Sequence, residues 1–134
     1  MLSKGELIAL AEESMKRSYS PYSGFRVGAA LECADGEIYT GCNIENAAFT
    51  PTNCAERTAF FKAVSEGKRD FVRIAVVGGK NGVISSMTAP CGVCRQVMRE
   101  FCGDDFRILM YDGGKITEKT LGELFPDSFG PADL

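Results

Sequence analysis

Three of the six cysteines lie at the starts of predicted helices, and this placement limits the possible folds and functions more than any other feature. Cys54 opens one helical pattern, whereas Cys91 and Cys94 share the first turn of another, three residues apart and on one helix face. The three thiols can therefore converge on one ion. Because the chain has no histidine, a metal site must use thiolates and carboxylates, and Ser-His-Asp or Cys-His catalysis is excluded.

A zinc ion with three protein ligands keeps a fourth position for water, which is typical of catalytic sites. Three thiolates leave the site with a net charge of about -1, so positive groups must offset it. We expect two helix N-termini and the guanidinium groups of Arg57 and Arg95 to do so, Arg57 especially by donating hydrogen bonds to the sulfurs. Glu56 can face the metal only if Cys54 occupies the helix cap or first turn, and Glu56 is then the expected general acid and base.

Each signal also has a simpler interpretation. A Cys-x-x-Cys pair can be a redox dithiol, and Cys33, Cys42 or Cys102 could close the site as a fourth thiolate. We favour these three as small buried hydrophobic residues. A carboxylate such as Glu56 in a first helical turn stabilises the helix dipole by about 0.3 to 1 kcal/mol without any catalytic role.

Composition favours one domain, over residues 1–134, that acts on a small molecule. The chain has 45% hydrophobic residues, enough for one core. A formal net charge of -3, a pI of about 5.0 and no basic stripe argue against nucleic acid as a partner. No apolar run approaches the roughly 20 residues needed to span a membrane, and no signal peptide is visible. We therefore expect a cytoplasmic protein, in which disulfides are rare.

Helical and strand patterns alternate along the chain. A capping box at Ser3 and Glu6 opens a helix to about residue 17, and Asp35-Gly36 marks a hairpin. The predicted elements are this helix, strands 25–33 and 37–42, a loop 43–53, helix 54–66, strand 72–77, a flexible loop 78–82, a helix with Pro90 in its first turn and 91–101 behind it, strands 106–111 and 116–119, and a helical turn 121–125. This order predicts an α/β layered domain in which the two later helix crossovers produce parallel neighbouring strands.

The segments CAE (54–56) and PCGVC (90–94) match the zinc nucleobase-deaminase signature in its three-cysteine variant. Over nearly its whole length the chain resembles the small cytidine deaminases, through PYSGF (21–25), GCNIENA (41–47), CAERTA (54–59) and PDSFG (126–130). The resemblance implies a layered sandwich with a mixed five-stranded sheet flanked by helices. It also implies one Zn²⁺ per subunit and a homotetramer whose sites are completed by neighbouring subunits.

The same resemblance assigns the substrate-binding residues. Asn43 and Glu45 match the positions that hydrogen-bond the ribose, and Phe25 matches the aromatic residue that packs on the pyrimidine. The backbone amide of Ala55 and the carbonyl of Ala89 match the groups that hold the base edge and the departing amine. Phe129 resembles the aromatic residue that reaches a neighbour's site. Blasticidin-type deaminases carry histidine where Asn43 stands, so the sequence favours a nucleoside enzyme.

We therefore expect zinc-dependent hydrolysis of free cytidine or deoxycytidine to uridine or deoxyuridine with release of ammonia, a step of pyrimidine salvage. A zinc-bound water is the expected nucleophile and Glu56 the proton shuttle. Two other functions stay open. One is a structural zinc or redox module, which a closed fourth position would indicate; the other is a polynucleotide editor, which the acidic balance disfavours.

Overall fold

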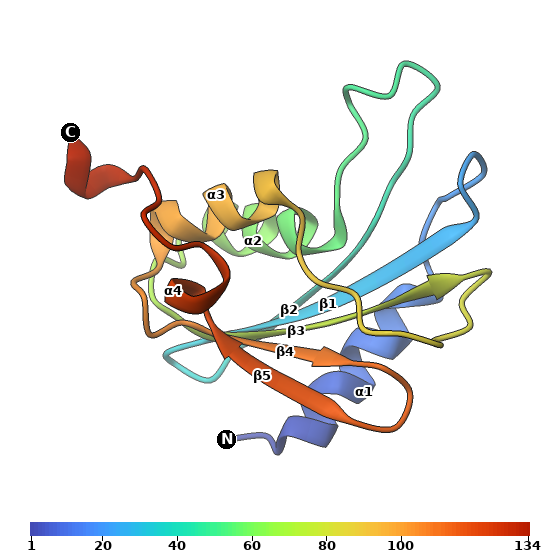
Figure 1. Cartoon of the computed structure of the whole chain (residues 1–134), viewed down its shortest axis with the longest axis horizontal. Coiled ribbons are helices and arrows are strands. Elements are labelled where there is room, and N and C mark those ends of the chain that lie inside the picture. Colours follow the sequence, from blue (N-terminus) through green and yellow to red (C-terminus); the bar gives the residue numbers. More distant parts are fainter.

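A hairpin forms where the sequence predicts it, and a mixed five-stranded sheet is built around it. The computed structural model describes residues 1–134. Its sheet has the order β2-β1-β3-β4-β5, with α1 on one face and α2, α3 and α4 on the other (Figure 1). The elements are α1 (Lys4–Met15), β1 (Phe25–Cys33), β2 (Ile38–Cys42), α2 (Ala55–Ser65), β3 (Phe71–Lys80), α3 (Gly92–Phe101), β4 (Arg107–Tyr111), β5 (Ile116–Thr120), α4 (Leu121–Leu124) and a final 3-10 helix (Pro131–Asp133). The predicted fold class is confirmed.

Only one of the two helix crossovers gives parallel neighbours. β3 and β4 pair in parallel through α3, but β3 pairs with β1 in antiparallel orientation instead of lying beside β2. The prediction for the first crossover is therefore wrong. β1 is buried over residues 28–33, and only Glu32 there is charged, which pairs with Arg73 of β3 at 2.6 Å. The hairpin leaves the second edge of β1 free, so pairing with β3 makes β1 an internal strand with both edges hydrogen-bonded.

β3 is longer than its sequence suggests. The segment Gly78 to Lys80, predicted as part of a flexible loop, continues the strand and pairs with Phe25 to Val27 of β1. Ladder hydrogen bonds to β1 here outweigh the low strand propensity of glycine. A side chain at Gly79 would place its Cβ 1.9 Å from the carbonyl oxygen of Val83, so glycine is needed where the chain folds back against the strand.

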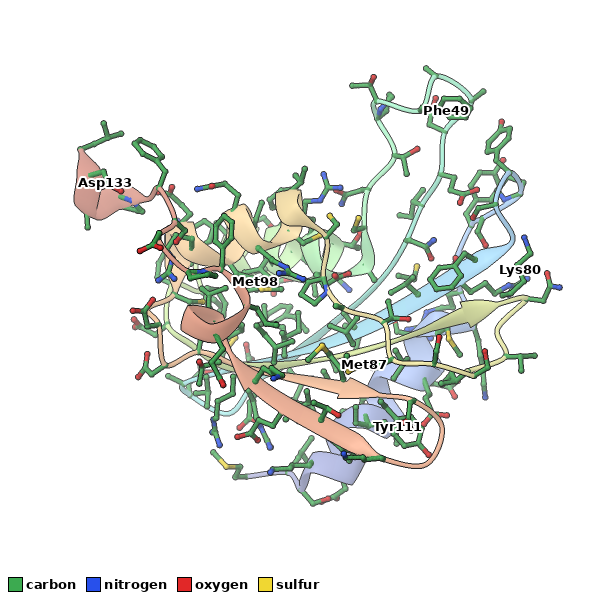
Figure 2. The ribbon with its side chains drawn as sticks, viewed as in Figure 1. Phe49, Lys80, Met87, Met98, Tyr111 and Asp133 are labelled. Carbon is green, nitrogen blue, oxygen red and sulfur yellow. The ribbon has the colours of Figure 1, made fainter.

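The core has one cluster on each face of the sheet. Neighbouring residues of β1 alternate between them: Ala30 packs in the cluster under α1, whereas Leu31 packs under α2 and α3. The larger cluster is centred on the fully buried Phe60 and includes Met98, which lies between α3 and the sheet (Figure 2). These helices are therefore fixed against a rigid surface. No helix is long and apolar enough to cross a membrane.

The first turn of α2 lies unusually close to β2. A Cβ atom at Gly41 would come within 2.5 Å of the carbonyl oxygen of Ala55 and 2.6 Å of the amide nitrogen of Ala59. Only glycine lets these two backbones approach so closely. The contact fixes the position of the α2 N-terminus, where Cys54 and Glu56 lie.

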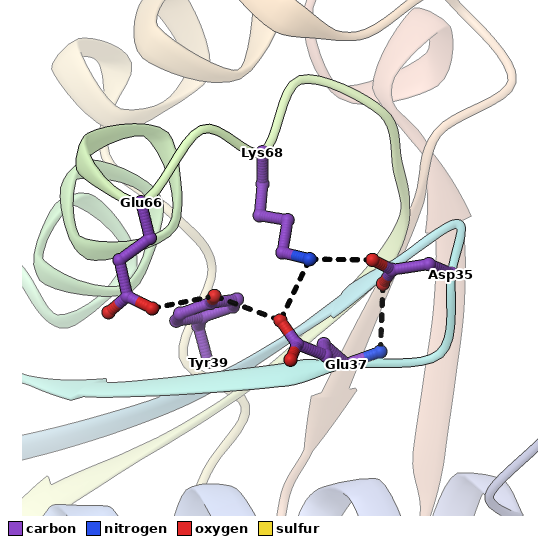
Figure 3. Close-up of polar contacts among 5 residues, drawn as sticks. All are labelled: Asp35, Glu37, Tyr39, Glu66 and Lys68. Carbon is purple, nitrogen blue, oxygen red and sulfur yellow. Dashed lines mark hydrogen bonds and ion pairs between the residues drawn. The ribbon is translucent and has the colours of Figure 1, made fainter.

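The other end of α2 is held by a polar network (Figure 3). Lys68, just after the helix, donates to Asp35 at 2.6 Å and to Glu37 at 2.9 Å in the β1–β2 turn. The hydroxyl oxygen of Tyr39 lies 3.0 Å from carboxylate oxygens of both Glu37 and Glu66. The network therefore links the C-terminal end of α2 to the hairpin that carries Gly41.

Candidate active site

The N-terminus of α2 carries the first two residues of the predicted site. Cys54 is the N-cap, with extended backbone angles (φ -76°, ψ 156°), as the sequence predicts. Because the cap residue is not helical, its side chain and that of Glu56 reach the same cavity. Thr58 stabilises this turn, since its hydroxyl oxygen lies within hydrogen-bond distance of two carbonyl oxygens, that of Cys42 at 3.0 Å and that of Cys54 at 3.2 Å.

The N-terminus of α3 supplies the other two sulfurs. Cys91 is the N-cap, and its Sγ accepts a hydrogen bond from the amide of Cys94 at 3.4 Å. The helix therefore begins at Gly92, and Pro90 precedes the cap instead of lying in the first turn as predicted. Cys94 is buried in the body of the protein, whereas Cys91 is exposed.

The ligand atoms of Cys54, Cys91 and Cys94 lie within 4.8 Å of one another, and the sulfurs of Cys54 and Cys91 are 3.7 Å apart. Sulfurs about 2.3 Å from one tetrahedral zinc ion would be about 3.8 Å apart, so the arrangement fits zinc. Cys33 and Cys102 pack with the core around Phe60, and no fourth ligand atom belongs to the group. The expected zinc site is confirmed with three protein ligands, and nothing supports a closed site of four thiolates.

Positive charge lies against these sulfurs. Arg57 donates from Nη2 to the Sγ of Cys54 at 3.2 Å, as expected, and its Nε is buried without a hydrogen-bond partner. Hydrogen bonds from Cys94 and Arg57 lower the pKa of the Cys54 thiol to about 5, which favours the thiolate that a metal binds. Arg95, the second guanidinium expected to offset the charge, donates to the carbonyl oxygens of Pro90 and Leu124 and makes no hydrogen bond to sulfur.

The three-sulfur cluster opens on a cavity of about 220 Å³ that gathers most of the predicted substrate-binding residues. It is lined by Ser23, Phe25, Val27, Asn43, Glu45, Thr52, Asn53, Cys54, Glu56, Thr88, Ala89 and Cys91. Five of these, Ser23, Val27, Thr52, Asn53 and Thr88, were not predicted. Ser23 lies within the segment PYSGF, and the signal for the other four is only that they lie close to motif residues. Phe129 lies outside the cavity and is 60% exposed.

Asn43 and Glu45 also hold the segment that carries Phe25. The Asn43 side chain accepts from the amide of Val27 at 2.9 Å and donates to the carbonyl oxygen of Phe25 at 2.8 Å. Glu45 accepts from the amides of Tyr22 at 2.9 Å and Ser23 at 3.1 Å. The hydroxyl of Ser23 also donates to Glu45 and is the main reason why the pKa of this carboxyl lies below its ordinary value. Both residues therefore shape the cavity wall.

Glu56 is the only carboxylate at the buried end of the cavity and is 3% exposed. Burial, reinforced by the negative charge of Cys54, raises the pKa of Glu56 to about 7. Its carboxyl group can therefore hold or release a proton near neutral pH, a property suited to general acid-base chemistry.

Two helix N-termini on one face of a mixed sheet bring together three zinc-binding sulfurs and a buried glutamate beside a small cavity, which is typical of a zinc-dependent hydrolase. Comparisons with known proteins specify the family. The family described as the cytidine and deoxycytidylate deaminase zinc-binding region matches residues 1–110. The chain belongs to this cytidine and deoxycytidylate deaminase family.

Similar proteins cover nearly the whole chain. A cytidine deaminase from Sporosarcina psychrophila is 50% identical over 130 residues, which are 96% of this chain and 93% of that protein. The crystal structure of a cytidine deaminase from Burkholderia pseudomallei superposes with a TM-score of 0.88 at 41% identity, covering 96% of this chain and 100% of that one. A blasticidin-S deaminase from Bacillus cereus is less similar, at 34% identity over 125 residues (90% of this chain, 88% of that protein).

Proposed function

We propose that this protein hydrolyses free cytidine or deoxycytidine to uridine or deoxyuridine and ammonia. The observation that carries the proposal is that the sulfurs of Cys54 and Cys91 and the carboxyl group of Glu56 line one small cavity, with Cys94 completing the sulfur cluster behind them. The three thiolates would hold one zinc ion. When bound, zinc supplies Lewis-acid chemistry that makes hydroxide available from water near neutral pH.

Glu56 moves the protons of the reaction. It takes one proton from the attacking water and delivers it to the ring nitrogen next to the amino-bearing carbon, so that hydroxide can add to that carbon. After the hydroxyl group has added, Glu56 transfers the remaining hydroxyl proton to the amino group. The carbon-nitrogen bond then breaks, ammonia leaves, and a carbonyl group forms. One water is consumed for each ammonia released.

The remaining cavity residues position the nucleoside. Phe25 packs on the pyrimidine and Asn43 and Glu45 bind the ribose hydroxyls in this proposal, which is supported by the presence of all three in the cavity lining. The amide of Ala55 lies at the first position of α2, where no partner exists within the helix, so it is available to the base edge. The carbonyl group of Ala89 is the proposed acceptor for the departing amine.

An ultraviolet assay on free cytidine and deoxycytidine, with and without a chelator, tests this function. We expect conversion of at least one nucleoside, loss of activity on zinc removal, and recovery when zinc is returned. Turnover of the free nucleoside should change little with salt, which would exclude a mode driven by phosphate contacts. If zinc-loaded protein converts neither nucleoside, the proposal is wrong.

A homotetramer with shared sites is the assembly we propose. Phe129 is exposed and lies outside its own subunit's cavity. The loop of residues 43–53 extends from the body of the protein with Phe49 at its tip (Figures 1 and 2), and Phe49 is 71% exposed. The exposure of both aromatic residues supports a role for them in contacts with another subunit. Light scattering should give four chains. Mixing the variants F129A and E56Q should restore activity above either alone, because an E56Q subunit can supply Phe129 to a neighbour.

We also propose that residues 1–134 form one domain that acts in the cytoplasm. The two core clusters share a single sheet, which supports one folding unit. All six cysteines are free, and three of them form the metal cluster, which supports a reducing compartment because thiols persist there.

A further inference from the structure

We propose that Arg95 is a positioning residue that fixes the zinc-ligand segment 89–91 by linking it to the C-terminal part of the chain. This inference extends the proposed function, because the segment carries Cys91 and the carbonyl group of Ala89. Arg95 itself touches neither the sulfur cluster nor the cavity. It acts through the two backbone carbonyl groups to which it donates hydrogen bonds, those of Pro90 and Leu124.

Two carbonyl groups that are far apart in the sequence share the Arg95 guanidinium. Nε donates to the carbonyl oxygen of Pro90 at 2.8 Å, and Nη1 donates to the carbonyl oxygen of Leu124. Leu124 is the last residue of α4, where helix carbonyls lack partners within the helix. A planar guanidinium presents donors in fixed directions, so it can orient both acceptors at once.

The Pro90 carbonyl is a sensitive point for the site. It belongs to the peptide group that joins Pro90 to Cys91, so its direction fixes the orientation of the backbone that carries the Cys91 side chain. The preceding peptide group carries the Ala89 carbonyl, the proposed acceptor for the departing amine. The side chain of Pro90 is fully buried, but proline has no N–H group, so the carbonyl is the only group through which a hydrogen bond can hold the Pro90 backbone. Without Arg95, the Pro90 carbonyl loses a charge-assisted hydrogen bond.

Arg99, one turn further along α3, provides a matched control. Its Nε donates to the hydroxyl of Ser128 at 2.8 Å, and its Nη2 lies 2.7 Å from a carboxylate oxygen of Asp104. It therefore ties the same helix to the same C-terminal part of the chain, but it has no hydrogen bond to the ligand segment. If Arg95 only attached the C-terminal part of the chain to α3, replacing Arg95 or Arg99 would change zinc release by a similar factor.

The experiment compares zinc-loaded R95M, R95K and R99M with the unchanged protein. The first measurement is the rate at which zinc passes to a coloured chelator, and the second is kcat per bound zinc. We expect R95M to release zinc at least ~10-fold faster and to lose at least ~10-fold in kcat, within the range seen when groups that orient metal ligands are removed. R99M should stay within about 2-fold of the unchanged protein in zinc release, even where its melting temperature falls.

R95K separates position from charge. Lysine keeps the charge but not the planar fork, so zinc release should lie between the rates of R95M and the unchanged protein. Full recovery in R95K would show that charge alone matters, and the proposal would be wrong. It would equally be wrong if R95M kept its zinc normally, or if R99M lost zinc as fast as R95M. If R95M does not fold, R95K carries the test, and release at the unchanged rate overturns the proposal. Because zinc release needs no substrate, the result stands apart from whether cytidine is turned over.

Discussion

Arg57 donates a hydrogen bond to the sulfur of Cys54 at 3.2 Å, from a position three residues further along α2. The two residues therefore lie on one helix face, and the guanidinium compensates negative charge where the thiolates gather. The chemistry of a site with three thiolates depends on this compensation, because zinc is a weaker Lewis acid when its ligands leave it negatively charged.

Replacing Arg57 should therefore weaken both metal binding and turnover. We expect R57Q to release zinc to a chelator about 10- to 100-fold faster and to lower kcat by a similar factor. R69Q is the control, because Arg69 lies beyond the C-terminal end of α2 and donates only to the carbonyl oxygens of Val64 and Lys68. Equal zinc retention in R57Q and the unchanged protein would contradict the role of Arg57.

Replacing Glu56 should separate proton transfer from metal binding. We expect E56Q to keep one zinc per chain while losing at least ~10²-fold in kcat, because glutamine has nearly the same size but cannot carry the proton. Metal analysis and the ultraviolet assay on one sample test this. An E13Q variant on the exposed face of α1 should behave like the unchanged protein. Full turnover in E56Q would remove Glu56 from the mechanism.

The six thiols should differ in their reactivity. Burial raises the pKa of Cys33 to about 11 and that of Cys102 to about 12, so at pH 8 both stay protonated and react slowly with a disulfide reagent. Removing zinc should expose Cys54 and the surface-exposed Cys91 to rapid labelling. Peptide mass mapping before and after chelation identifies the sites. Fast labelling of Cys33 in the folded protein would contradict its place in the core.

The network at the C-terminal end of α2 should give a pH-dependent contribution to stability. Lys68 lowers the pKa of Asp35 and Glu37 below their ordinary values of 3.8 and 4.5. Carboxyls with a lowered pKa in the folded state stabilise it above those ordinary values, and the effect is lost as pH falls through the lowered ones. K68M should therefore melt at a lower temperature than the unchanged protein at pH 7, and the difference should shrink as the pH is lowered toward 2. An equal difference at both pH values would mean that packing, not charge, is lost.

Gly41 should be intolerant of a side chain. G41A places a methyl group against the backbone of α2, so we expect a loss of about 1 to 3 kcal/mol of unfolding free energy together with reduced activity, since the shifted helix carries Cys54 and Glu56. Chemical denaturation and the cytidine assay measure the two effects. G5A is the control, because the nearest atom to its new Cβ would be 4.0 Å away, and it should not be destabilised. A G41A variant as stable as the unchanged protein would contradict the close approach.

Local patterns in the sequence predict the helix caps and turns of this fold better than they predict which strands pair. The capping box at Ser3 and Glu6, the hairpin turn at Gly36 and the cap position of Cys54 are all found as expected. Each depends on residues within a few positions of one another. The partner of β3 and the extension of that strand through Gly78 depend on pairing across the sheet, which leaves no periodic signal in the sequence.

The sequence by itself determined which atoms can bind the metal, because without histidine the three helix-start cysteines are the ligands that its motifs provide. It also determined that Glu56 stands beside Cys54, since cap geometry is local. Only the tertiary structure decided that the two helix starts meet, that unpredicted residues such as Thr88 line the cavity, and that Arg95 binds backbone instead of sulfur. The physical reason is how far apart in the sequence the interacting residues lie. Caps and turns are set by neighbouring residues, whereas these contacts exist only after distant segments have packed on one sheet.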